Sequence, residues 1–158
     1  MERFDSRALL AVTAFILVAV AAACGQTGVL RIAGVAPNAL LVTLVVLSFF
    51  CENLPFYLLL VFFAVLIGRV TPTFFDPVAT VTAFLALLVF WLERRLVWPG
   101  LIGVVIMVGI TTFLTYLFLS PAMLIQHFGI LAGELVYNVG VGLLLFEALR
   151  LVFGQRAR

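Results

Sequence analysis

Long apolar blocks alternate along this chain with short breaks that are rich in charge, proline or glycine. The blocks lack the apolar/polar alternation of barrel strands, and a backbone in lipid must satisfy its hydrogen bonds within each segment, so the pattern predicts α-helices. A membrane-spanning helix needs roughly 17 to 25 residues, and the second to fourth blocks are short by this measure. The six predicted spans are 8–24, 36–51, 55–70, 77–92, 100–119 and 130–153.

The composition favours a membrane rather than water as the surroundings of the chain. Hydrophobic residues make up 66% and charged residues 10% of the sequence, and the mean hydropathy is +1.34. Soluble domains are about half apolar and a quarter charged. No polar stretch is long enough for a water-soluble domain, so we expect residues 1–158 to form one transmembrane helical domain in the lipid bilayer. The net charge of +2 requires no nucleic-acid partner.

The break at Glu52, Asn53 and Pro55 leaves two topologies open. Residues 36–70 either cross the membrane twice or enter and return as a re-entrant hairpin, and both versions leave every other span with the same orientation. We expect two full crossings.

The first block has a basic start and ends in Ala-Ala-Ala-Cys, features that it shares with a cleaved secretory or lipoprotein signal. However, Ala21 occupies the position where such signals usually have a large aliphatic residue, and further spans follow. We therefore expect an uncleaved first helix.

Arginine placement gives the expected orientation, because the chain has no lysine and basic residues near span ends are retained in the cytoplasm. With the amino terminus inside, only Arg31 and Arg69 lie outside. The sequence thus predicts a multi-pass protein of the cell membrane with both termini cytoplasmic. Cys24 and Cys51 would then lie near opposite surfaces, about 30 Å apart, too far for a disulfide.

Signals for catalysis and metal binding are sparse. His127 is the only histidine, and it has no cysteine or carboxylate at ligand spacing. The chain also lacks GxGxxG, a phosphate loop, GxSxG and HExxH. We therefore expect no enzyme activity, no metal and no cofactor. Asp76, which precedes Pro77, and Glu52 are expected to cap helix amino termini.

The last block contains glycines on one side of its predicted helix. At 100° per residue, Gly129, Gly133 and Gly140 fall on one face, and this strip is expected to pack closely against another helix within the bundle. In the fifth block, four hydroxyl-bearing residues are expected to bond internally or across helices: Thr111, Thr112, Thr115 and Tyr116.

Glu134 and Asn138 project from the other side of the last helix, and Tyr137 lies between that side and the glycine strip. Because an acid in hydrocarbon is costly, such residues are expected to face a polar pocket, a second polypeptide or a water-filled cavity. The alternative is that Glu134 simply benefits from the helix dipole near the amino end of the helix. Glu147 is expected to pair with Arg150 at the opposite end.

Two longer stretches are distinctive. The segment GQTGVLRIAGVAPNALLVTLVVLSFF has a glutamine near the end of a first span and Pro-Asn at the start of a leucine-rich second one. The ending GELVYNVGVGLLLFEALRLVF has a Tyr-Asn pair and leads into a basic tail. In these features the chain resembles the rod-shape-determining membrane protein MreD family. The middle segment LIGRVTPTFFDPVA departs from that family's frequent Gly-rich third span and small Pro-Gly-containing loop.

The resemblance implies a non-catalytic scaffold of the bacterial cell-elongation machinery, which makes peptidoglycan. Such a protein would bind the bitopic protein MreC and help couple MreB filaments to RodA and its penicillin-binding partner. The resemblance also implies a fold similar to the substrate-binding subunits of energy-coupling-factor vitamin transporters, and this class is the alternative function. A transport subunit would need a ligand cavity near the outer surface, involving Gln26, Asn38, Glu134, Tyr137 and Asn138.

Overall fold

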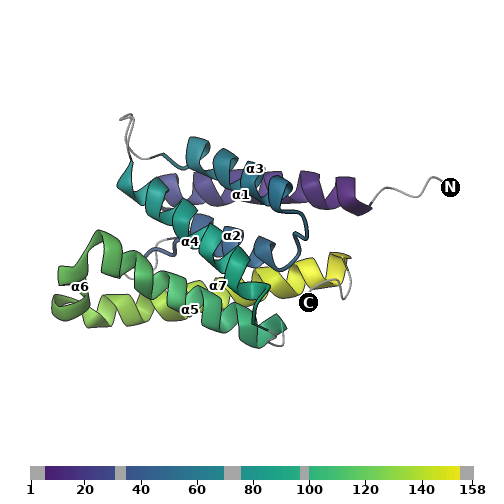
Figure 1. The fold of residues 1–158 in the computed structure, drawn as a ribbon. Helices are drawn as coiled ribbons and strands as arrows, with labels where there is room; N and C mark the ends of the chain where they lie inside the picture. Colours follow the sequence, from purple (N-terminus) through teal and green to yellow (C-terminus); the bar gives the residue numbers. More distant parts are fainter. Residues whose placement is uncertain (1–5, 31–34, 70–75, 97–99, 154–158) are drawn as a thin grey trace.

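The computed structural model describes residues 6–30, 35–69, 76–96 and 100–153. The regular elements of these residues are all α-helices, which confirms the predicted all-α class. Figure 1 shows them running back and forth along one bundle. They are α1 (Ser6–Thr27), α2 (Ala39–Ser48), α3 (Leu54–Ile67), α4 (Pro77–Glu93), α5 (Gly100–Leu119), α6 (Pro121–Gln126) and α7 (Phe128–Phe153).

Each of the six predicted blocks corresponds to one helix, and the structure adds the short α6 in the break between the fifth and sixth blocks. By length and composition, α1, α5 and α7 are long and apolar enough to cross a membrane, whereas α2, α3 and α4 are shorter. The beginning of α1 and the end of α7 lie at the same end of the bundle, and α6 lies at the opposite end (Figure 1).

The central element of the bundle is α2, which contacts α1, α3, α4, α5 and α7. Every residue from Leu41 to Phe50 is buried, so α2 has no face left for lipid. At a rise of about 1.5 Å per residue its ten residues are roughly 15 Å long, about half the thickness of the hydrocarbon layer. The longer helices therefore surround a short apolar core helix.

Tyr57 packs α3 against this core. Its side chain is fully buried, and its ring stacks on Phe90 of α4 with the centroids 4.5 Å apart. The Tyr57 hydroxyl donates a hydrogen bond to the carbonyl oxygen of Leu44 in α2 at 2.9 Å. One residue thus links three helices while its polar atom is satisfied.

Capping residues fix where two of the helices begin. Asp76 accepts hydrogen bonds from the backbone N–H groups of Val78 at 2.9 Å and Ala79 at 3.3 Å, which confirms its predicted role at the start of α4. At α3 the prediction for Glu52 is wrong, because Asn53 occupies the N-cap position and makes no side-chain capping bond there. With Pro55 in the first turn, fewer amide donors need a cap.

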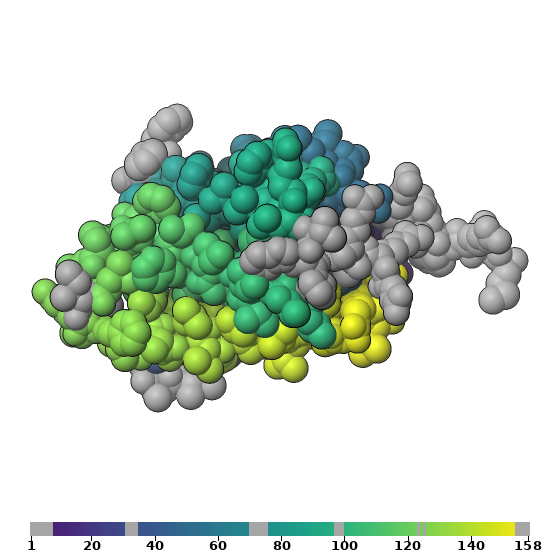
Figure 2. Space-filling model, turned by 60° about the horizontal axis from the view of Figure 1, so that its bottom comes forward, coloured from purple at the N-terminus to yellow at the C-terminus, as the bar shows by residue number. Residues whose placement is uncertain are grey.

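The outer faces of the bundle are apolar. Figure 2 shows the face formed largely by α5 and α7, coloured green to yellow. On α7 the side chains of Val136, Leu144 and Leu151 are at least 70% exposed. Such a surface is unfavourable in water and suits contact with lipid or with other apolar helices.

Candidate functional site

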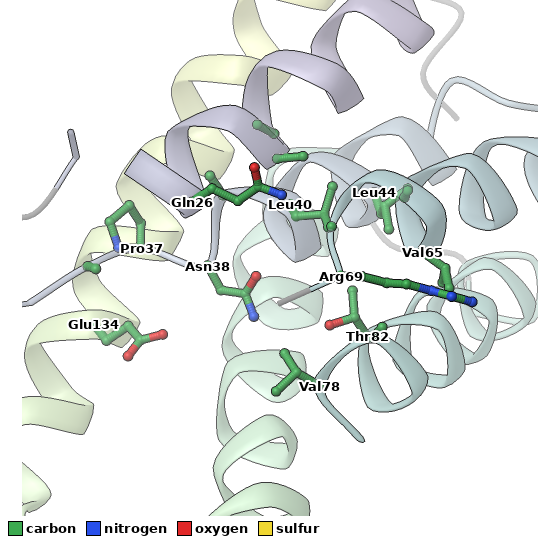
Figure 3. A pocket seen from close by; sticks show the side chains of 18 residues that line it. Gln26, Pro37, Asn38, Leu40, Leu44, Val65, Arg69, Val78, Thr82 and Glu134 are labelled. Carbon is green, nitrogen blue, oxygen red and sulfur yellow. The ribbon is translucent and has the colours of Figure 1, made fainter. Parts of the chain in front are cut away.

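A cavity of about 620 Å³ lies where the ends of α1 and α3 meet the beginnings of α2, α4 and α7 (Figure 3). Its wall is mainly alanine, glycine, valine and leucine. Five residues bring polar side chains to it: Gln26, Asn38, Arg69, Thr82 and Glu134. A mostly apolar lining with a few polar groups is typical of small-molecule sites, which span roughly 300 to 1,000 Å³.

The cavity exists because α2 begins late and the residues around its start are small. Residues 36–38 approach α2 without helical structure, and Asn38 caps the helix by accepting a hydrogen bond from the Leu41 N–H at 3.2 Å. On α1, the wall residues Ala21, Ala22 and Gly25 have little or no side chain. Space is therefore left between α1, α3 and α4 around the beginning of the core helix.

Asn138 holds α7 against this region from within the bundle. Its side chain is fully buried, and its amide oxygen accepts a hydrogen bond from the Asn38 N–H at 3.0 Å. Its amide nitrogen donates to the Thr112 hydroxyl of α5, also at 3.0 Å. Because a buried amide is costly without partners, this pair of bonds fixes how α7 is rotated against α2 and α5.

Glu134 lies one turn before Asn138 and does line the cavity. The Tyr116 hydroxyl of α5 donates a hydrogen bond to one of its carboxylate oxygens. Figure 3 shows the carboxylate turned toward the side of the cavity where Asn38 lies. Among the residues that the structure describes, no basic side chain forms an ion pair with Glu134.

Gln26 lines the cavity from the end of α1. Its side-chain amide donates a hydrogen bond to the Ile67 carbonyl oxygen at 2.7 Å, which ties the last turns of α1 and α3 together. Gln26, Asn38 and Glu134 therefore all line the cavity. Tyr137 and Asn138 lie outside the cavity lining, Tyr137 partly buried and Asn138 within the bundle.

The glycine strip of α7 does not pack against another helix as expected. Gly129 and Gly140 are exposed, and a side chain at either position would meet no atom within 4 Å. Of the three strip residues only Gly133 has a close neighbour, Val35, at 3.4 Å from an added Cβ. The face that packs inward contains Asn138 and Gly142, where an added Cβ would lie 3.2 Å from Val108. Sequence periodicity separated the two faces correctly, but the bonds of Asn138 decide which one turns inward.

Two wall residues, Thr82 and Arg69, were not among the predicted site residues. Thr82 of α4 is only 5% exposed, and it lines the cavity, where its hydroxyl is not among the buried atoms that lack a partner. Figure 3 shows this hydroxyl turned toward Asn38, whereas the Arg69 side chain extends along another wall, away from Glu134. The predicted hydroxyl bonds of α5 are confirmed: Thr111 and Thr115 bond within the helix, and Tyr116 bonds across to α7.

The remaining candidates lie apart from the cavity. His127 is exposed, and within the described residues no group of three or more potential ligands is placed to hold a metal ion. Cys24 and Cys51 are both free thiols. Glu147 pairs with Arg150 at 2.8 Å near the end of α7, as predicted.

No protein-family model, curated protein or solved structure matches the chain. The fold and the cavity define its class as a bundle of apolar helices, three of them long enough to cross a membrane. The resemblance to the MreD family stays a prediction.

Proposed function

We propose that this chain is a multi-pass protein of the bacterial cell membrane and a non-catalytic scaffold of the cell-elongation machinery. In this role it binds an MreC-like bitopic protein. RodA, a penicillin-binding protein and MreB filaments are the further partners that the family resemblance implies.

One contact carries the proposal. The family resemblance rests on two motifs, the Pro-Asn before the second span and the Tyr-Asn pair of the last helix. Asn38 and Asn138 belong to these motifs, and the Asn38 N–H donates to the Asn138 side chain across 100 positions of sequence. Two loose motifs that meet in space form one structural unit, which makes their joint presence more informative than either alone.

The use of the polar residues also supports a scaffold. Asn138 bonds Asn38 and Thr112, Glu134 bonds Tyr116, and Gln26 bonds a backbone carbonyl. Each bond joins two segments that are distant in sequence, so this set of polar groups positions helices. A rigid framework with apolar outer faces suits binding of other membrane helices.

The proposed topology has six spans and both termini in the cytoplasm. It is consistent with helices that alternate in direction and with a bundle in which α1 begins where α7 ends (Figure 1). The short α2 and α3 keep the re-entrant hairpin as the competing arrangement for residues 36–70.

The scaffold role is tested by crosslinking in native membranes followed by mass-spectrometric identification of partners. A stoichiometric single-span partner is expected, and depletion of the protein should round rod-shaped cells. Normal cell shape together with no single-span partner would refute the proposal.

The cavity favours a second candidate, a substrate-binding membrane subunit of a vitamin transporter. Gln26, Asn38 and Glu134 line it, and its volume of about 620 Å³ suits a small molecule. This candidate expects a nutrient requirement on depletion and a vitamin that remains bound through purification. The two depletion phenotypes separate the candidates.

A further inference from the structure

The cavity is lined by a threonine, Thr82, whose hydroxyl is available to a bound molecule. The Thr82 hydroxyl has one donor and two acceptor sites, and Thr82 is only 5% exposed. Its oxygen is nevertheless not among the buried side-chain atoms that lack a partner, so it is open to the cavity. Threonines in membrane helices can satisfy their hydroxyls on the preceding turn, as Thr111 does on the Met107 carbonyl oxygen at 2.7 Å. Thr82 instead directs its hydroxyl into the cavity (Figure 3).

The cavity also contains an acid without a cation. Glu134 accepts one hydrogen bond from Tyr116, and no described basic residue pairs with it. Arg69, the cavity's basic residue, extends away from it (Figure 3). A carboxylate in apolar surroundings is stabilised by an opposite charge, and here the open space beside it is where that charge can be supplied.

We propose that the cavity binds a small molecule that contains an ammonium group. The ammonium pairs with the Glu134 carboxylate, a neighbouring polar atom of the ligand bonds the Thr82 hydroxyl, and the apolar remainder lies against the alanine-rich wall. The Asn38 side chain borders the same space and contributes a second hydrogen-bonding group. An ethanolamine lipid headgroup and a soluble amine share this chemistry.

The inference rests on the cavity and not on the scaffold role. A scaffold can contain a bound lipid, and a transport subunit would carry a soluble amine. Loss of the ligand site therefore leaves the scaffold proposal standing, and absence of a single-span partner leaves the ligand site standing.

The first test is native mass spectrometry of the full-length protein, extracted from its own membranes in polymer nanodiscs. The expected result is a retained small molecule whose fragmentation reveals an amine. Protein without an adduct, or with one that lacks an amine, would overturn the proposal.

Reconstitution distinguishes the two sources of the ammonium group. Vesicles of phosphatidylethanolamine are compared with vesicles of phosphatidylglycerol, and ethanolamine is added to the latter as the soluble probe. A ligand that binds the folded state raises the melting temperature, so either probe should stabilise the protein relative to phosphatidylglycerol alone. Stabilisation by the lipid only or by ethanolamine identifies the source, and stabilisation by neither contradicts the proposal.

Two conservative variants test the named groups. Glu134→Gln removes the charge, and Thr82→Val removes the hydroxyl, with little change of shape. Losing a charge-assisted hydrogen bond should weaken binding about tenfold or more, and losing the neutral one by less. The matched controls are Glu147→Gln on the same helix and Thr115→Val, neither of which lines the cavity. Equal ligand retention in Glu134→Gln and Glu147→Gln would exclude Glu134 as the counter-ion.

A filling variant tests the cavity without removing any polar group. Gly25 lines the cavity, and an added Cβ there meets no atom within 4 Å. Gly25→Leu should therefore fold normally and lose the adduct, whereas Gly140→Leu, equally open but outside the cavity, should keep it. Retention of the adduct in folded Gly25→Leu would place the ligand elsewhere.

Discussion

At the scale of single residues, Asn138 is the side chain on which the packing of α7 depends. It bonds the Asn38 N–H and the Thr112 hydroxyl, and a replacement that cannot bond leaves the partly buried Asn38 N–H and the buried Thr112 hydroxyl without this partner. We expect Asn138→Leu to lower the free energy of unfolding by about 1–2 kcal/mol, since interhelical bonds in membranes contribute modestly and orphaned partners add to the cost.

Thermal melting of the purified protein measures this effect. The control is Asn53→Ala, because Asn53 is exposed and makes no side-chain capping bond. If both variants melted at the same temperature, Asn138 would not be the residue that fixes the rotation of α7.

The sequence identified some site residues and missed others for a physical reason. An acid or amide inside an apolar block is conspicuous because it is expensive there, and so Gln26, Asn38 and Glu134 could be singled out. A threonine is inconspicuous, because Thr111 and Thr82 look alike in sequence. Only the fold shows that the first bonds its own helix while the second faces a cavity.

At the scale of helices, apolar blocks and their breaks were enough to predict six of the elements. The second block was predicted to be longer than α2 is, since α2 begins only after Asn38. At its other end, the Phe49 N–H bonds the Val46 carbonyl oxygen three residues earlier, in a tighter turn. The short α6 was not predicted, because it lies in a break between two apolar blocks. Pro121 occupies the first position of this helix, where proline is well tolerated.

The beginning of α4 depends on Asp76, which accepts hydrogen bonds from two N–H groups of the first turn. We expect Asp76→Ala to destabilise the protein by about 0.5–2 kcal/mol, the usual cost of losing an N-cap, and Asp76→Asn to recover most of the loss. The first turn should also fray, so hydrogen exchange at Val78 and Ala79 should become faster.

Glu52→Ala provides the comparison for Asp76, because Glu52 precedes a helix in a similar sequence context and yet does not occupy the N-cap position. Its exchange and melting should match those of the unmodified protein. Exchange in α4 that stays slow in Asp76→Ala would show that the cap does not control the start of this helix.

At the scale of the whole molecule, the sequence predicted the all-α class but not which helix lies at the centre of the bundle. The block that forms α2 is apolar like its neighbours, and nothing in hydropathy says which block will be surrounded by the others. Burial of α2 follows from its length: a ten-residue helix between longer ones can be covered on every side. The cavity is a consequence of the same mismatch, since it lies beside the first turn of the short core helix.

Single cysteines can test the orientation of the whole bundle. Thr27 and Glu52 are both exposed and stand at the outer end of α1 and the inner break before α3 in the proposed topology. In a variant without Cys24 and Cys51, Thr27→Cys should react with a membrane-impermeant maleimide in intact cells.

Glu52→Cys should react only after the membrane is opened, because the second span would have carried it to the cytoplasmic side. The native Cys51 is unsuitable for this measurement, since it is 4% exposed and would react slowly from either side. Labelling of both Thr27→Cys and Glu52→Cys in intact cells would mean that residues 36–70 enter the membrane and return without crossing it. If Glu52→Cys were labelled in intact cells and Thr27→Cys were not, the bundle would have the opposite orientation in the membrane. That result would contradict the arrangement derived from the arginines.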